Sequence, residues 1–245
     1  MHPYLKAKSP SILAHRGGSL ETSENTLQGF EYAINLGAEY IETDVQLSKD
    51  GIPYIFHDDD LKRICKKNIT FNQLNGNEID LIKIFNGCNI PTLQECLDVF
   101  PDTKFNIDLK TDEVVVPALK ILSNMKTEDR VCIASFANER LEFTRENYPK
   151  FCTSMGPKEI LNLKLSSLGI SSPKVSGNCV QIPIYKYAIK LVTKRLIRLS
   201  HKLGLKVHVW TINDPNIMQK LIDMDIDGII TDKPKLLREI IQGLN

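Results

Sequence analysis

Two acidic residues stand two positions apart in a short apolar segment, Glu42 and Asp44. Residues i and i+2 of a strand point to the same face, so the two carboxylates would lie side by side. Like charges at this separation repel one another unless a cation lies between them, and carboxylate oxygens suit hard divalent ions such as Ca²⁺ or Mg²⁺. The alternative is a pair of solvated charges at a strand end, which the apolar neighbours Ile41 and Val45 disfavour. The pair therefore predicts a metal site.

The same two-residue spacing recurs in a later apolar segment, at Asp108 and Lys110. Asp108 offers a third carboxylate for the metal, and Lys110, on the same face, offers a charge for a phosphate group. An Asp–Lys ion pair inside the fold explains the spacing equally well. Spacing alone leaves the two interpretations open.

Two histidines end apolar segments near these acids, His15 and His57. Asp50-Gly51 is a strong signal for a two-residue hairpin turn. Counting back along both arms then places His57 opposite Asp44, with Cβ atoms about 4.5–5.5 Å apart, although a slip of one residue would turn His57 to the other face. Two histidines beside a carboxylate-bound cation can serve as general base and general acid near pH 7.

Other polar and aromatic residues near segment ends are candidates for substrate binding. Arg16 carries a planar fork suited to phosphate oxygens, and the two glycines after it let the backbone approach a ligand closely. Trp210 is either core or an apolar wall of the pocket, and its place near a strand end favours the wall. We expect His201 to be solvated, His208 to be a satisfied interior residue, and Asn25 to be only a cap-region residue.

The elements that must position these residues alternate between short apolar runs and amphipathic stretches. Strands are predicted at residues 11–14, 39–47, 103–109, 130–134, 151–155, 179–183, 206–211 and 228–231. Helices are predicted at 25–37, 93–100, 113–125, 138–148, 159–165, 192–203, 216–224 and 235–242. Eight strand–helix units in about 250 residues are the size of an α/β fold of the TIM (β/α)8 barrel type, with its active site at the carboxyl ends of the strands. A doubly wound sheet is the runner-up, but the turn after the first strand does not match G-x-G-x-x-G.

The chain is predicted to form one domain, residues 1–245, with a small insertion after the second barrel strand. A hairpin arm at 52–56 leads into an irregular polar segment at about 58–89, which is too long for an ordinary connection. Because this segment lacks the strand–helix periodicity, we expect a cap that contributes nothing to barrel closure.

Composition excludes several classes of protein. Of the 245 residues 42% are hydrophobic and 25% charged, which is ordinary globular composition. The formal net charge of +1 argues against a nucleic-acid binder. No apolar run approaches the roughly 20 residues of a membrane span, so no stable membrane insertion is expected, and the short polar start does not resemble a signal peptide. The six cysteines form no close pair in the sequence, which predicts reduced core thiols in a cytoplasmic protein, not a disulfide framework or zinc site.

At these positions the sequence resembles the glycerophosphodiester phosphodiesterase family, over nearly the whole chain in order. The most specific motifs are Ala14-His15-Arg16-Gly17-Gly18, Glu24-Asn25-Thr26, Ile41-Glu42-Thr43-Asp44-Val45, Lys49-Asp50-Gly51 and Phe56-His57-Asp58. Corroborating motifs are Asn106-Ile107-Asp108-Leu109-Lys110, Ser135-Phe136, Trp210-Thr211-Ile212-Asn213 and Asp227-Gly228-Ile229-Ile230-Thr231-Asp232-Lys233-Pro234.

The resemblance implies a TIM barrel that hydrolyses glycerophosphodiesters, small-molecule substrates, to glycerol 3-phosphate and an alcohol with a divalent metal ion, Mg²⁺ or Ca²⁺. Matching motif positions assigns the acid–base pair to His15 and His57, the metal ligands to Glu42 and Asp44, and the phosphate ligands to Arg16 and Lys110. Asp108 stands where the family often has Glu, so it would ligate the metal directly or through a water. The segment after His57 matches the small insertion that such enzymes carry over the barrel mouth.

Three other functions remain open. A lysophospholipase D-like enzyme would need an apolar entry to the site, and the polar segment at 58–89 instead favours water-soluble headgroups. A catalytically silent phosphodiester-binding protein should lack a histidine or a carboxylate of the set, and this chain keeps them all. A barrel for some other sugar-phosphate chemistry is the third. The sequence does not decide the oligomeric state.

Overall fold

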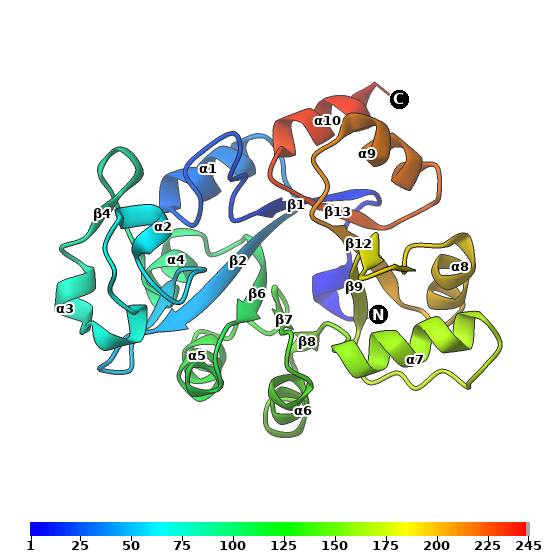
Figure 1. Ribbon diagram of the computed structural model, residues 1–245, viewed down its shortest axis with the longest axis horizontal. Helices are drawn as coiled ribbons and strands as arrows, with labels where there is room; N and C mark the ends of the chain where they lie inside the picture. Colours follow the sequence, from blue (N-terminus) through cyan, green and yellow to red (C-terminus); the bar gives the residue numbers. More distant parts are fainter. Residues whose placement is uncertain (244–245) are drawn as a thin grey trace.

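The computed structural model describes residues 1–243, and its centre is a ring of eight parallel strands (Figure 1). In their order around the ring the strands are β8 (Cys152–Thr153), β7 (Val131–Ala134), β6 (Lys104–Leu109), β2 (Tyr40–Leu47), β1 (Ser11–His15), β13 (Gly228–Thr231), β12 (Lys206–Trp210) and β9 (Cys179–Pro183). A single parallel bridge between Ser154 and Cys179 brings β8 to β9, so the barrel is nearly closed. The predicted (β/α)8 architecture is confirmed.

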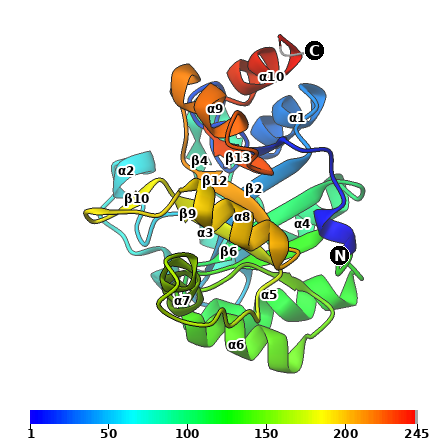
Figure 2. The same ribbon diagram turned by 90° about the vertical axis from the view of Figure 1, so that its right-hand side faces the viewer.

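Helices surround the strands, and one helix follows each barrel strand in the chain (Figures 1 and 2). They are α1 (Leu27–Asn35), α4 (Leu93–Val99), α5 (Asp112–Asn124), α6 (Asn138–Asn147), α7 (Pro157–Ser167), α8 (Lys194–Lys202), α9 (Pro215–Ile222) and α10 (Pro234–Gln242). Between β2 and α4 the chain also forms the inserted segment described below. The cap of α1 is Thr26, whose hydroxyl accepts from the Gly29 amide. Asn25 is therefore not the cap residue, and it lies instead beside Asp44.

Strand register brings the chemically interesting residues to one end of the barrel. His15 is paired with Glu42 across β1 and β2, and Asp44 with Asp108 across β2 and β6. All three strands run in the same direction, so their carboxyl ends meet at the same mouth. Residues that alternate with these along each strand face the surrounding helices and form the apolar layer between sheet and helices.

The hairpin register differs by one residue from the prediction. Strand β3 (Pro53–Ile55) pairs antiparallel with β2, with Val45 opposite Ile55. The turn therefore contains three residues, Lys49 to Gly51, and Phe56, not His57, stands opposite Asp44 and donates its amide to the Asp44 carbonyl. The predicted facing of His57 and Asp44 is wrong.

The physical reason for the longer turn lies in contacts that local sequence does not show. Ser48 accepts from the Ile52 amide and donates to the Asp50 carboxylate, which in turn accepts from the Gly76 amide. Gly51 adopts φ +85°, as the last residue of a three-residue hairpin loop does. Asp50 thus binds the cap instead of completing a two-residue turn.

The segment after β3 carries only small elements of its own. They are α2 (Lys62–Cys65), η2 (Phe71–Gln73), α3 (Gly76–Ile79), β4 (Lys83–Ile84), η3 (Phe85–Gly87) and β5 (Cys88–Asn89). None of them pairs with the barrel strands in the described part of the chain. Their apolar side chains form a separate cluster that also includes Tyr54 and Phe56 of the hairpin arm. The core of this cap therefore begins before residue 58.

The opposite end of the barrel, its floor, is covered by the start of the chain. A short 3₁₀ turn, η1 (Pro3–Leu5), places Tyr4 and Leu5 in a cluster with inward-facing residues of β1, β2 and β7–β9. Between floor and mouth, Asn106 and Gln181 exchange side-chain amide hydrogen bonds across the barrel. Among the described residues, no helix combines the length and the apolar character that a membrane crossing needs.

Candidate active site at the barrel mouth

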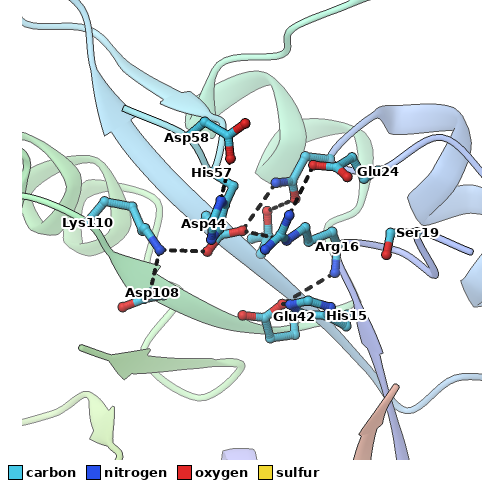
Figure 3. A network of polar contacts seen from close by, with 12 residues as sticks. His15, Arg16, Ser19, Glu24, Glu42, Asp44, His57, Asp58, Asp108 and Lys110 are labelled. Carbon is cyan, nitrogen blue, oxygen red and sulfur yellow. Dashed lines mark hydrogen bonds and ion pairs between the residues drawn. The ribbon is translucent and has the colours of Figure 1, made fainter. Parts of the chain in front are cut away.

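Three buried carboxylates lie at the carboxyl ends of β2 and β6, Glu42, Asp44 and Asp108 (Figure 3). Asp44 Oδ1 is 3.4 Å from the Lys110 ammonium, and Asp44 Oδ2 is 3.4 Å from Arg16 Nε. Asp108 Oδ2 is 3.2 Å from the same ammonium, whereas its Oδ1 is buried without a hydrogen-bond partner. An acceptor that is buried and unpaired is costly unless something binds it.

The carboxylates are only partly neutralised by protein groups. Burial raises the pKa of Glu42 to about 7; His15 offsets this in part, and Asp44 and Asp108 add to it. Burial likewise raises the pKa of Asp108 to about 6, against the opposing charge of Lys110. A raised carboxyl pKa means that burial disfavours the charged form more than the neighbouring cations favour it. A divalent cation would favour the charged form, and carboxylate oxygens are the ligands that a hard ion prefers. The unpaired Oδ1 of Asp108 suits such an ion, and binding of a metal by these three residues stays a prediction.

Arg16 and Lys110 lie on opposite sides of Asp44 (Figure 3). Arg16 adopts a left-handed backbone conformation, φ 52°, at the end of β1, and its amide donates to the Glu42 carbonyl at 2.8 Å. This conformation returns the guanidinium over the mouth, where Nη1 is 3.2 Å from Glu24. Arg16 and Lys110 both flank Asp44, so an anionic group that enters the mouth beside Asp44 can contact both cations.

His15 is held by a carboxylate from the last barrel strand. Its Nδ1 is 2.5 Å from Asp232, which also accepts from Ser19 and Asn213. Its Nε2 is 3.8 Å from Glu42. Burial lowers the pKa of His15, but Glu42 and Asp232 outweigh burial and raise it overall. The ring is therefore fixed in orientation, with Nε2 directed at the carboxylate cluster.

His57 is held in a similar way. Its Nδ1 is 2.6 Å from Asp58, and Asp58 accepts from Arg63 Nε at 2.7 Å. In the view of Figure 3 the ring lies between Asp58 and Asp44. His57 reaches the mouth although the hairpin register is shifted, because the chain leaves the strand after Ile55. The two histidines therefore lie near the carboxylates, as predicted. The reason given for His57, direct pairing with Asp44 across the hairpin, is wrong.

Several residues that contact the candidate active-site side chains were not predicted as site residues. Glu24 joins Arg16 to Arg63, and hydrogen bonds and charge from the two guanidinium groups lower its pKa against the effect of burial. The Asn25 side chain donates to Asp44 at 3.3 Å and accepts from Thr43. Asp232 has its pKa lowered to about 2 because its bonds to His15 and Ser19 outweigh burial. The sequence position of Asp232 could have indicated its role, because it directly follows β13, which neighbours β1 and His15 in a closed barrel.

The remaining part of the mouth is aromatic. Trp210 ends β12 and packs edge-to-face on Phe136 at 5.7 Å between ring centroids. After β9 a small hairpin of β10 (Tyr185–Lys186) and β11 (Ile189–Lys190) exposes Tyr185 and Tyr187. Trp210 ends its strand near the mouth and also packs against the interior cluster of Tyr4 and Leu13, and its role as a pocket wall stays a prediction. His201, which was predicted to be solvated, is instead 2.8 Å from Asp227.

Comparison with known proteins gives one consistent result. Residues 15–236 match the model of the glycerophosphoryl diester phosphodiesterase family. A probable glycerophosphodiester phosphodiesterase 2 of Mycobacterium tuberculosis is 31% identical over 97% of this chain and 93% of its own. A human lysophospholipase D is 23% identical over 95% of this chain and 86% of its own.

Solved structures show the same fold. A glycerophosphodiester phosphodiesterase of Thermotoga maritima superposes with a TM-score of 0.75 at 28% identity, covering 96% of this chain and 99% of that one. An Oleispira antarctica phosphodiesterase in complex with the product sn-glycerol-3-phosphate has a TM-score of 0.81 at 24% identity, covering 95% and 97%. At that identity the second likeness concerns the fold alone.

Proposed function

The chain belongs to the glycerophosphoryl diester phosphodiesterase family, and on that premise we propose that it hydrolyses glycerophosphodiesters to glycerol 3-phosphate and an alcohol by acid–base catalysis between His15 and His57. The phosphoric diester hydrolase activity itself follows from membership of the family. The histidine roles, the metal ligands and the substrate range are the parts that we propose.

One observation supports the histidine roles above all. Each of the two rings has its Nδ1 on a carboxylate, Asp232 for His15 and Asp58 for His57. A carboxylate on Nδ1 fixes the tautomer and leaves Nε2 to move a proton to or from the substrate. One histidine deprotonates the attacking hydroxyl, from water or from the neighbouring glycerol carbon, and the other protonates the leaving alkoxide.

The family is typically metal-dependent, and three residues of this chain would hold the ion: Glu42, Asp44 and Asp108. The unpaired Oδ1 of Asp108 and the raised pKa of Glu42 support this assignment. When bound, the cation would neutralise charge that develops on the phosphate oxygens. The donor set suits Mg²⁺ or Ca²⁺.

Arg16 and Lys110 would hold the phosphate. Both are pinned near Asp44 at 3.4 Å, so their charged groups are already ordered before substrate binds. Ordered donors lose little conformational entropy when a phosphate arrives. Arg16 offers a two-pronged contact and Lys110 a point charge.

The test is release of glycerol 3-phosphate from glycerophosphocholine, followed with a coupled dehydrogenase. We expect turnover that stops with EDTA and returns when Mg²⁺ or Ca²⁺ is added in excess. Glu42→Gln should stay inactive at every metal concentration, whereas Glu139→Gln, at an exposed carboxylate, should behave as wild type. Release of glycerol 3-phosphate that EDTA does not change would overturn the metal assignment, and failure to release it from any glycerophosphodiester would overturn the substrate.

The aromatic part of the mouth favours a second candidate, a lysophospholipase D-like activity. Exposed Phe136, Tyr185 and Tyr187 offer an apolar approach that lies outside the polar cap. A human relative bears the name lysophospholipase D. If this activity dominates, lysophosphatidylcholine should be cleaved faster than glycerophosphocholine, and Tyr187→Ser should lower only the former rate.

A further inference from the structure

Three of the six cysteines meet inside the barrel floor. Cys132, Cys152 and Cys179 belong to the successive strands β7, β8 and β9, and their sulfur atoms all lie within 4.8 Å of one another. The Sγ atoms of Cys132 and Cys179 are 3.9 Å apart, and all three residues are fully buried. The sequence, which shows no close pair, predicted separate core thiols. Barrel curvature is what brings the three strands' inward positions together.

The spacing of the three sulfurs fits a metal, and all three cysteines are free thiols. Cys132 and Cys152 face one another across β7 and β8 at a separation that a disulfide could span, but a disulfide would use only two of the three sulfurs. Metal–sulfur bonds of about 2.3 Å place three sulfurs around one ion roughly 4.0 Å apart. Cys132 and Cys179 come from strands separated by β8. Two strand spacings put their Cα atoms roughly 9–10 Å apart, beyond the range of about 4.4–6.8 Å that a disulfide spans.

Two buried polar groups beside the sulfurs lack partners. The Tyr4 hydroxyl and His208 Nδ1 have no hydrogen-bond partner, and both residues are almost completely buried. The Tyr4 hydroxyl is a proton donor that is buried without an acceptor. A metal-bound thiolate is a far better acceptor than a thiol. His208 was predicted to be interior and satisfied; it is interior, but not satisfied.

We propose that Cys132, Cys152 and Cys179 form a binding site for one thiophilic cation, Cu(I) or Zn²⁺. Thiolate sulfur selects such soft ions, whereas the carboxylates at the mouth select hard ones. Each cysteine that coordinates releases its proton to solvent, so three protons leave for each ion bound. The site is separate from the active site, because the Asn106–Gln181 amide pair lies between floor and mouth.

The position of the site gives it a structural purpose. β8 has only two residues, and a single bridge joins it to β9, so this is the weakest seam of the barrel. An ion held by β7, β8 and β9 would cross-link the seam from inside. Tyr4 covers the sulfurs, so the ion would also secure the start of the chain.

The experiment loads the buried site during folding. Wild-type protein is unfolded in guanidinium with reductant and chelator, refolded with one equivalent of Zn²⁺ or Cu(I), and passed through a chelating column before its metal content and native mass are measured. Wild type should retain one equivalent and unfold at a higher temperature than metal-free protein. Cys152→Ser and Cys132→Ser should retain less than about a tenth of that.

Two control variants distinguish binding at these three sulfurs from binding elsewhere on the protein. Cys96→Ser changes a cysteine that is equally buried but lies in another cluster, and it should retain the ion fully. Glu42→Gln removes a ligand of the mouth and should also retain it. If the cysteine variants fail to refold, near-ultraviolet sulfur-to-metal absorption of wild type, and of wild type refolded with Co²⁺, still reports thiolate coordination. Absence of that absorption together with no retained ion, or equal retention by a variant with all three cysteines changed to serine, would overturn the proposal.

Discussion

The two ends of the barrel bury polar groups in opposite ways. The mouth concentrates ionisable groups, three carboxylates with Arg16 and Lys110 among them, and Asp44 pairs with both of the cations. The floor holds neutral, weakly polar groups, the three thiols and the hydroxyls of Tyr4 and Tyr40, packed in an apolar cluster. The same strands supply both ends. The difference teaches that the mouth is arranged for binding and chemistry at a cost in stability, whereas the floor is mainly apolar packing, with Tyr4 and His208 as unsatisfied exceptions.

The strongest test of this contrast is removal of a mouth carboxylate. Glu42→Ala or Asp44→Ala should abolish turnover and cation dependence while the fold remains, because like charges at the mouth repel. Steady-state kinetics and thermal unfolding check this, and the unfolding temperature should stay constant or rise. An unaltered rate in either variant at limiting Mg²⁺ or Ca²⁺ would contradict the assignment of the metal site.

The histidines come next in expected effect. His15→Ala and His57→Ala should each lower the rate by at least about 10²–10⁴-fold, the usual contribution of a positioned proton-transfer group. The double variant should be little worse than either single one, since groups that act as a unit are not additive. Substrates with a nitrophenol leaving group should rescue only the variant that lacks the general acid. Near-normal rates in both variants would place the acid–base pair elsewhere.

A smaller effect is expected in the pH dependence of stability. The pKa of Glu42, about 7, and that of Asp108, about 6, lie above their usual values of 4.5 and 3.8. The folded protein therefore binds more protons than the unfolded chain in this range, and stability of the metal-free protein should fall as pH rises from about 4 to 7. Denaturant titrations at several pH values measure this. Glu42→Gln should flatten the slope and saturating divalent ion should reduce it, and a wild-type slope of opposite sign would refute the assignment of these two raised pKa values.

The smallest effect is expected at the floor. The Tyr40 hydroxyl donates to the Tyr4 carbonyl at 2.9 Å. Tyr40→Phe should lower the free energy of unfolding by about 1 kcal/mol, the usual worth of such a bond, and leave kcat/KM unchanged. Tyr32→Phe, whose hydroxyl contacts Glu21 near the surface, is the matched control with a smaller loss. A drop in kcat/KM with unchanged stability would show that floor and mouth are not independent.

Local sequence predicted those features that depend on local periodicity. The eight barrel strands follow from apolar runs, and the common face of Glu42 and Asp44 follows from their spacing. The hairpin register could not be predicted, because the turn length depends on the contact of Asp50 with Gly76, a residue of the cap. The contact of His15 with Asp232 and the cysteine cluster could not be predicted either, because both depend on closure of the ring. His15 and Asp232 are 217 positions apart, and Cys132 and Cys179 are 47 apart.

Arg63 of α2 joins the cap to the mouth, since it binds both Glu24 and Asp58. Its side chain is about half exposed, so added salt screens these two ion pairs far more than it screens the buried pairs beneath them. Asp58 in turn orients His57. Ionic strength should therefore act more on His57 than on His15: concentrated salt weakens the support that Arg63 gives to Asp58, while Asp232 keeps His15 in place. At high ionic strength the turnover rate should therefore fall while the protein stays folded.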